Sequence, residues 1–206
     1  MLFQNEVLTR ISMANNTTPA ILEKHKQKLE TNHTTFSNAH SPPRDLLITH
    51  GDGSIQILDY PSFEVLHTLS SHTSSCSSIA YSPTGKHIAV GGSDAMIALW
   101  DTYDWVCKRT LSNPSSGKVT GLSWSWDGRY LTSACEDTTS GSIGDNKSAG
   151  FDIYHVETGD VVYTVPTGTS PVPAVAWHPT SYVLAYTQIE NGKSSLKVVG
   201  MAENAT

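Results

Sequence analysis

The chain has 206 residues, and its 13 Lys and Arg side chains against 19 Asp and Glu give a formal net charge of -6. This balance disfavours a protein whose main work is to neutralise nucleic-acid phosphates, because such binding needs a basic surface. The cysteines include no CxxC pair, so we expect reduced thiols rather than a disulfide framework or a zinc site. The sequence has no run of about 18 apolar residues, so we expect no membrane-spanning segment. We therefore expect no cofactor, no metal ion and no membrane contact.

Residues 1–44 predict a flexible segment that carries one short helix. Polar runs and a proline-rich end flank residues 18–29, where Thr18 can cap a helix and Pro19 fits its first position. The apolar stripe of this helix is thin, so we expect the helix to be marginal and exposed.

From residue 45 onward the sequence repeats every forty residues or so. Residues 81–89, 124–132 and 177–185 each read as a strand that ends in an aromatic residue, a tight turn and a second strand. A second landmark closes each repeat at spacings of 42, 54 and 45 residues, and its positions are Leu58, Trp100, Tyr154 and Val199. The longer repeat contains a polar, Gly-rich insertion at 138–150. This period predicts β-propeller blades, which have four strands per repeat.

The best of these repeats resembles the WD-repeat family. It runs from Ser71 and His72 to Asp94 and the Trp100-Asp101 close. In that family a His, a Ser or Thr, an Asp and the Trp form a buried hydrogen-bond chain within the blade. The resemblance therefore implies structural WD-repeat roles for His72, Asp94, Trp100, Asp101 and, by its match to Asp94 in the next repeat, Asp137.

The hydroxyl position of that hydrogen-bond chain looks lost. Val90 and Gly92 stand where the family has Ser or Thr. We therefore expect the chain of hydrogen bonds to be incomplete and the blade to be less rigid.

The predicted fold is all-β: an incomplete WD-repeat β-propeller with about three and a half blades of a seven-bladed pattern. Residues 1–44 form the flexible, partly helical segment, and 45–206 form the partial propeller. Its blades are predicted at 45–71, 72–112, 113–166 and 167–200. We expect the last blade, after Ser170, to have three strands, and the isolated chain to be poorly soluble.

The ordered departures from the family pattern narrow the resemblance. The repeat that contains Trp177, His178 and Pro179 does not end in Trp-Asp. Together with the other departures, in their order along the chain, this repeat is similar to the C-terminal half of the WD-repeat subunit of THO complexes. The similarity implies a non-enzymatic scaffold in the nucleus that couples transcription and mRNA processing to export. Its partners would be other THO/transcription-export subunits, with no small-molecule substrate and with RNA contact indirect at most. A generic WD-repeat adaptor, such as a ubiquitin-ligase substrate receptor, and a non-functional truncated paralogue are the alternatives.

Two side-chain groupings allow a second interpretation. His72, Asp94 and Ser93 have the residue types of a catalytic triad, but the WD-repeat pattern assigns this His and Asp to a structural network. Trp124 and Trp126 lie two residues apart and would share one strand face if the strand continues that far. Core packing between blades is the usual role of such a pair, and a peptide-binding aromatic ledge is the alternative.

Overall fold

The computed structural model describes residues 3–4, 7–12, 20–26, 31–36, 44–60, 62–112, 117–135, 150–167, 170 and 172–200. All regular elements in these residues are strands, which confirms the all-β fold. Within the same residues there is no helix of the length and hydrophobicity needed to cross a membrane. The chain divides into two compact units, residues 1–31 and 32–206, which are described separately.

The first unit contains a three-stranded antiparallel sheet rather than the predicted helix. Its strands are β1 (Phe3–Gln4), β2 (Val7–Ser12) and β3 (Ala20–Lys26), in that order. The helix predicted over 18–29 is therefore wrong where the structure describes it. A short isolated helix has a costly nucleus, whereas β2 pairs with β3 from Val7↔Lys26 to Ser12↔Ala20 and so supplies backbone partners along the strand.

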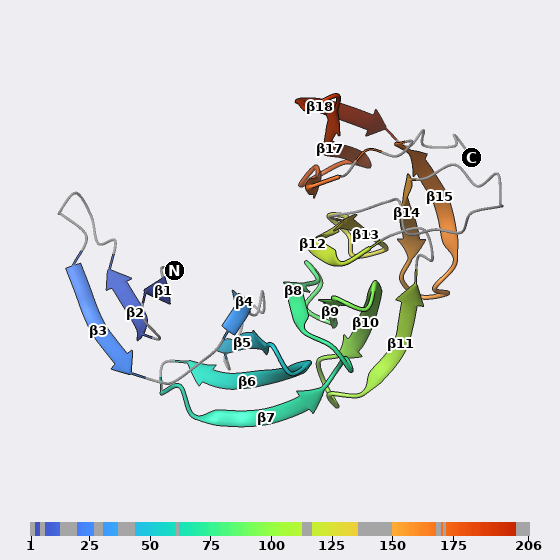
Figure 1. Ribbon diagram of the computed structural model, residues 1–206. Coiled ribbons are helices and arrows are strands. Elements are labelled where there is room, and N and C mark those ends of the chain that lie inside the picture. Colours follow the sequence, from blue (N-terminus) through green and yellow to red (C-terminus); the bar gives the residue numbers. More distant parts are fainter. Residues whose placement is uncertain are drawn as a thin grey trace. The chain divides into compact units, whose positions relative to one another are not determined.

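The second unit contains four sheets in chain order (Figure 1). Each is an antiparallel meander in which every strand pairs with the next, as in propeller blades. The first sheet is β4 (Thr31–Phe36), β5 (Arg44–His50), β6 (Ser54–Tyr60) and β7 (Val65–Ser70). The second is β8 (Cys76–Tyr81), β9 (His87–Gly92), β10 (Met96–Asp101) and β11 (Cys107–Ser112). The third is β12 (Val119–Trp124), β13 (Tyr130–Cys135), β14 (Gly150–His155) and β15 (Val161–Pro166).

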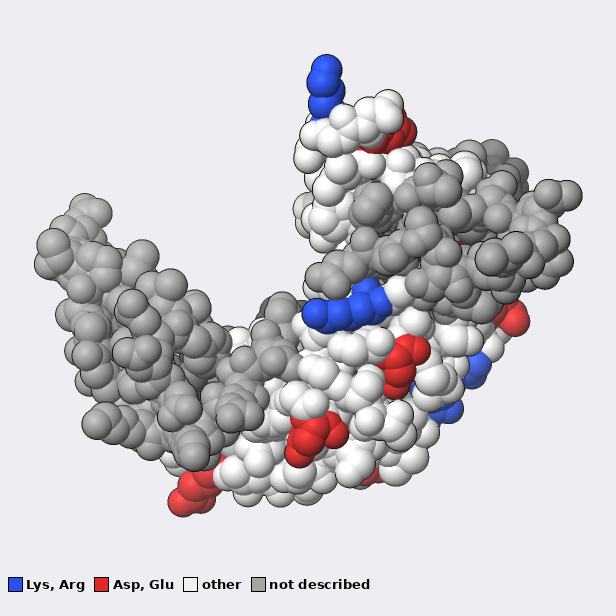
Figure 2. All heavy atoms as spheres, in the orientation of Figure 1, with Lys and Arg blue, Asp and Glu red and all other residues white. Residues whose placement is uncertain are grey.

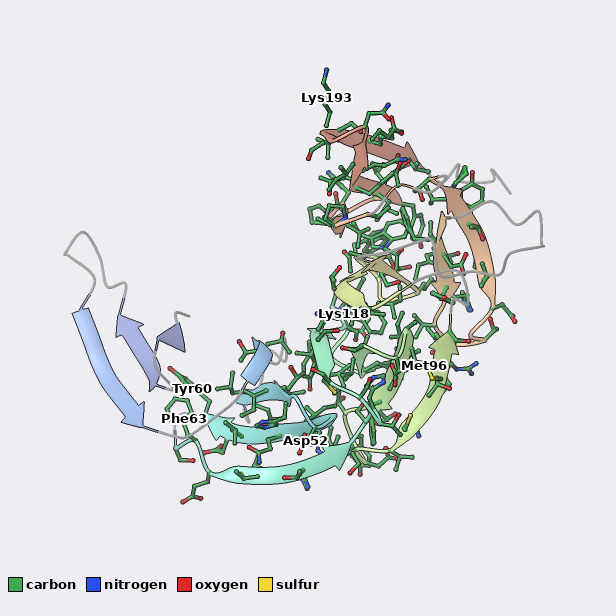
Figure 3. The ribbon with its side chains drawn as sticks, viewed as in Figure 1. Asp52, Tyr60, Phe63, Met96, Lys118 and Lys193 are labelled. Carbon is green, nitrogen blue, oxygen red and sulfur yellow. The ribbon has the colours of Figure 1, made fainter. Side chains whose placement is uncertain are left out.

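The fourth sheet has three strands among the described residues, as expected for the segment after Ser170. They are β16 (Ala174–Trp177), β17 (Val183–Glu190) and β18 (Lys193–Gly200). One face of this sheet packs on the third sheet, and the other leaves Leu196 71% and Val198 61% exposed. Lys193 projects from the start of β18 away from the sheet (Figure 3).

The first sheet begins earlier than the sequence predicts. β4 belongs to it and lies before residue 45, where the flexible segment was predicted to end. The segment reads as polar, but three of its six residues are Thr and a fourth is Phe36, and β-branched and aromatic residues favour strands.

The predicted turns recur in equivalent form. Gly85 and Gly128 have φ of 74° each, the positive values expected for tight turns. The same backbone bond closes the hairpin after each of the three aromatic strand ends: Ser82 N to His87 O, Ser125 N to Tyr130 O and His178 N to Val183 O, at 2.8–2.9 Å. The repeat seen in the sequence is thus a repeat of backbone geometry.

Each pair of neighbouring sheets encloses its own hydrophobic cluster. Between the first and second sheets lie Leu47, Ile55, Ile57, Ile79, Ile88, Val90 and Trp100, with others. Between the second and third lie Ala89, Ile97, Leu99, Leu111, Trp124, Leu131 and Tyr154, with others. Between the third and fourth lie Phe151, Ile153, Val165, Val172, Trp177, Leu184 and Tyr186. The sheets therefore depend on one another for burial.

Gly91 on β9 allows the second and third sheets to approach closely. A Cβ atom there would overlap Val119 Cγ1 and would lie 2.6 Å from Ser78 Oγ. We expect Gly91→Ala to lower the free energy of unfolding by about 1–3 kcal/mol, the usual cost of overpacking a core. Urea denaturation measures this effect.

Gly51→Ala is the matched control, because no atom lies within 4 Å of a Cβ at that position. Equal stability of the two variants would show that the sheets do not meet at Gly91.

Candidate functional site

His72 is held from both sides by acceptor atoms. It lies between β7 and β8, and its Nδ1 is 3.1 Å from Asp94 Oδ1 and 3.0 Å from Asp94 Oδ2. Its Nε2 is 3.1 Å from the carbonyl oxygen of Val90, and the side chain is 2% exposed. Carboxylate and carbonyl oxygens only accept, so an imidazolium ring satisfies both contacts and a neutral ring satisfies one.

These contacts do not form a catalytic triad. The ring nitrogen that would face a serine nucleophile contacts the Val90 carbonyl, and among the described hydrogen bonds none joins Ser93 to His72. A general base has to be within hydrogen-bond reach of the proton that it removes. His72 and Asp94 instead pair with each other, and the second ring nitrogen of His72 is occupied by the Val90 carbonyl.

Ser71 provides the hydroxyl that sequence reasoning missed. The Trp100 indole N–H donates to Ser71 Oγ at 3.1 Å. His72 contacts the backbone carbonyl of Val90 instead of a side-chain hydroxyl. The expected continuous series of hydrogen bonds is therefore replaced by two separate sets, one at Trp100 and one at His72, which are linked through the Ser71–His72 backbone. The signal for this was available in the sequence, because Ser71 stands where the family usually has Gly.

Two glycines fix this network in place. A Cβ at Gly92 would overlap Asp94 Oδ1 and lie 2.5 Å from His72 Nδ1. Gly53, with φ of 88°, accepts the backbone N–H groups of both Ser71 and His72 at 3.0 and 3.1 Å. The carbonyl of Gly53 therefore ties the first sheet to the segment that leads into the second.

The other predicted structural positions differ in outcome. Asp101 accepts the backbone N–H of Tyr103 at 2.8 Å. This hydrogen bond is the main reason why the pKa of Asp101 is lowered, although burial acts in the opposite direction. Asp101 thus stabilises the β10–β11 turn. Asp137 and nearly all of the 138–150 insertion lie outside the described residues.

The described cysteines and histidines show no metal-binding geometry. No group of three or more His, Cys, Asp or Glu in the part of the chain that the structure describes is placed to hold a metal ion. Burial raises the pKa of the Cys76 thiol to about 12, so this thiol is unreactive. His178 Nδ1 lies 2.8 Å from Ser181 Oγ, so its ring is engaged within the turn that follows β16.

Trp124 and Trp126 do not share a strand face. β12 ends at Trp124, which is buried and donates its indole N–H to Ala80 O at 3.2 Å across the sheet interface. Trp126 lies in the turn that follows, and it is 46% exposed. Its ring centroid is 6.2 Å from that of Tyr182 in the fourth sheet's first turn, with an angle of 44° between the planes.

Asp127 connects the third and fourth sheets beside these rings. Its Oδ2 accepts the Tyr182 hydroxyl at 2.6 Å, and its Oδ1 accepts Ser125 Oγ–H at 2.7 Å and the Arg129 N–H at 3.1 Å. Burial raises the pKa of Asp127, but these hydrogen bonds together outweigh burial, so the pKa lies below 3.8.

Comparison with known proteins identifies the repeat. The WD domain, G-beta repeat family matches residues 63–101 and 105–139. The chain is 34% identical over 163 residues to THO complex subunit 3 of Arabidopsis thaliana, which covers 79% of this chain and 47% of that protein. It is 32% identical over 138 residues to WD repeat-containing protein AAC3 of Dictyostelium discoideum, which covers 66% and 26%. The chain spans at most about half the length of these relatives.

Solved structures show the same fold. The beta-propeller domain of Cps50 (Swd1) from Myceliophteria thermophila superposes with a TM-score of 0.68 at 13% identity, over 93% of this chain and 63% of that one. A chain of the Mitotic Checkpoint Complex superposes with a TM-score of 0.70 at 21% identity, over 89% and 54%. At these identities the likeness concerns the fold alone.

We expect Ser71→Ala to lower the free energy of unfolding by about 1–2 kcal/mol, because the nearly buried Trp100 N–H loses its acceptor. Ser70→Ala, on the exposed strand β7, is the control. In the double variant with Trp100→Phe, the loss due to Ser71→Ala should largely disappear. A Ser71→Ala effect that persists unchanged in the Trp100→Phe background would contradict this pairing.

We expect the hydrogen bonds of Asp127 to make the free energy of unfolding fall in acid. Its pKa is lower folded than unfolded, so the stability it adds is complete above pH 3.8 and is lost as pH falls through the lower folded value. In urea titrations, wild type should lose more stability than Asp127→Asn between about pH 5 and pH 2. Asp160→Asn, which removes an exposed carboxylate, should follow wild type. Parallel curves for wild type and Asp127→Asn would refute this.

Proposed function

We propose that this chain, which carries WD domain, G-beta repeats at residues 63–101 and 105–139, is a non-enzymatic scaffold subunit of a THO/transcription-export complex. In this proposal it acts in the nucleus, where it couples transcription and mRNA processing to mRNA export. The observation that carries the proposal is the similarity to THO complex subunit 3 over 79% of the chain.

The use of polar side chains supports a scaffold rather than an enzyme. His72, Asp94 and Asp101 are engaged in bonds that hold strands and turns together. A catalytic group instead needs access to a substrate and a partner that activates it. In this proposal, the chain acts through surfaces that bind other proteins.

The surface also supports protein partners over direct RNA binding. In the view of Figure 2, most of the described surface carries no charge, and its Lys and Arg side chains are dispersed. The open face of the fourth sheet exposes Leu196 and Val198, and exposed apolar surface is typical of protein interfaces. RNA contact in the assembly would then come from other, more basic subunits.

Affinity purification of the tagged chain from nuclear extract tests this proposal. We expect mass spectrometry to recover other THO subunits in stoichiometric amounts, because a scaffold subunit remains bound in its complex. The control is Gly53→Val, whose side chain would overlap the His72 carbonyl and disrupt the fold. Proteins recovered with both forms are background.

Two outcomes would contradict the proposal. Recovery with a cullin-type ligase would favour the adaptor function instead. Recovery only with cytoplasmic proteins unrelated to THO would exclude the export function.

A further inference from the structure

Trp126 occupies a turn position that does not need a tryptophan. The corresponding residues in the second and fourth sheets are Pro83 and Pro179, and both are exposed. The hairpin bond from Ser125 N to Tyr130 O equals its counterpart from Ser82 N to His87 O at 2.9 Å. The same turn is therefore built around proline elsewhere in this chain, and the exposed indole of Trp126 has no structural cause in the turn.

Trp126 and Tyr182 form a tilted aromatic pair, which we call the wedge. Their planes meet at 44°, which is neither stacked nor perpendicular, and their centroids are 6.2 Å apart. Tyr182 is fixed by its hydroxyl bond to Asp127 and by an edge-to-face contact with Tyr130 at 5.5 Å. Tyr130 in turn stacks on the buried Trp177 at 6.3 Å. One side of the wedge is thus rigid, and the other side is an exposed ring.

The polar groups at the wedge restrict what it can bind. No hydrogen bond to the Trp126 indole N–H occurs among the described residues, so this donor is free for a ligand acceptor. Arg129 lies beside the wedge with its Nε 3.5 Å from Asp127 Oδ2, and its side chain is 68% exposed. The guanidinium is paired with the Asp127 carboxylate through Nε, and because the side chain is mostly exposed its other N–H donors remain accessible to an anionic group of a ligand.

We propose that the Trp126–Tyr182 wedge binds an extended, proline-containing segment of a partner protein with an acidic residue next to the proline. A proline ring is compact and rigid and packs on the exposed Trp126 ring beside Tyr182, as on the aromatic side chains of grooves that bind polyproline II segments. The backbone carbonyls of such a segment have no internal hydrogen bonds, so one of them can accept the Trp126 N–H. The acidic residue pairs with Arg129.

This site does not depend on the THO assignment, because it requires only a partner segment of this chemistry. A wedge of two aromatic residues with an arginine has the composition of an interaction hot spot.

Calorimetric titration of the full chain tests the site. The probe is a synthetic peptide with two prolines flanked by glutamates, and the peptide controls replace both prolines by alanine or both glutamates by lysine. We expect binding of the first peptide and at least tenfold weaker binding of each control peptide. Trp126→Pro should weaken the first peptide at least tenfold and should fold, because proline occupies this position in two sister turns. The control is Tyr103→Ala, which removes a 95% exposed aromatic residue from another turn and should bind within twofold of wild type.

A second measurement keeps the test valid if Trp126→Pro does not fold. The Trp126 indole N–H signal among the five tryptophans, assigned by its loss in Trp126→Phe, should move during NMR titration with the peptide. The proposal is overturned if this signal stays in place while others move, or if no peptide saturates the chain. It is also overturned if a single-stranded oligonucleotide moves the signal and the peptide does not, since base stacking would then explain the wedge.

Discussion

Each sheet of the second unit can bury its apolar side chains only against a neighbouring sheet, and the rest of the structure follows from this constraint. A strand presents alternate residues to opposite faces, and β9 shows the result. Ile88 and Val90 face the first sheet, whereas Ala89 between them faces the third. The middle sheets are therefore apolar on both faces. Glycine is needed at position 91, where a Cβ would overlap the Val119 side chain of the next sheet.

The parts of the fold that follow from local chemistry could be predicted from the sequence. A turn that needs positive φ requires Gly85 or Gly128 at a fixed distance from an aromatic strand end, and this signal is present in the second and third sheets. The N-terminal strands could not be predicted in this way. Thr18 and Pro19 are good helix-start signals, but they do not show that β2 offers a pairing partner to residues 20–26. The strand character of β4 was likewise hidden by its polar composition.

The site followed the family pattern in its residue types and departed from it in its bonding. The sequence could identify His72, Asp94 and Trp100 as candidate network residues, because the repeat pattern specifies which residue types recur at these positions. It could not show that the Val90 carbonyl replaces a side-chain hydroxyl, because a backbone atom leaves no trace in residue identity. Ser71 and Trp126 were both visible as departures from expected residues. Their roles required the positions of Trp100 and Tyr182, which come from elements 29 and 56 residues further along the chain.

The position of the Ser71 hydroxyl also restricts which substitutions this blade tolerates. Glycine at 71, the usual residue of the family, would leave the Trp100 N–H without an acceptor. A replacement hydroxyl cannot arise at Gly92, because any Cβ there collides with the His72–Asp94 pair. While His72 and Asp94 remain paired, the acceptor for the Trp100 N–H therefore has to come from position 71 rather than from position 92.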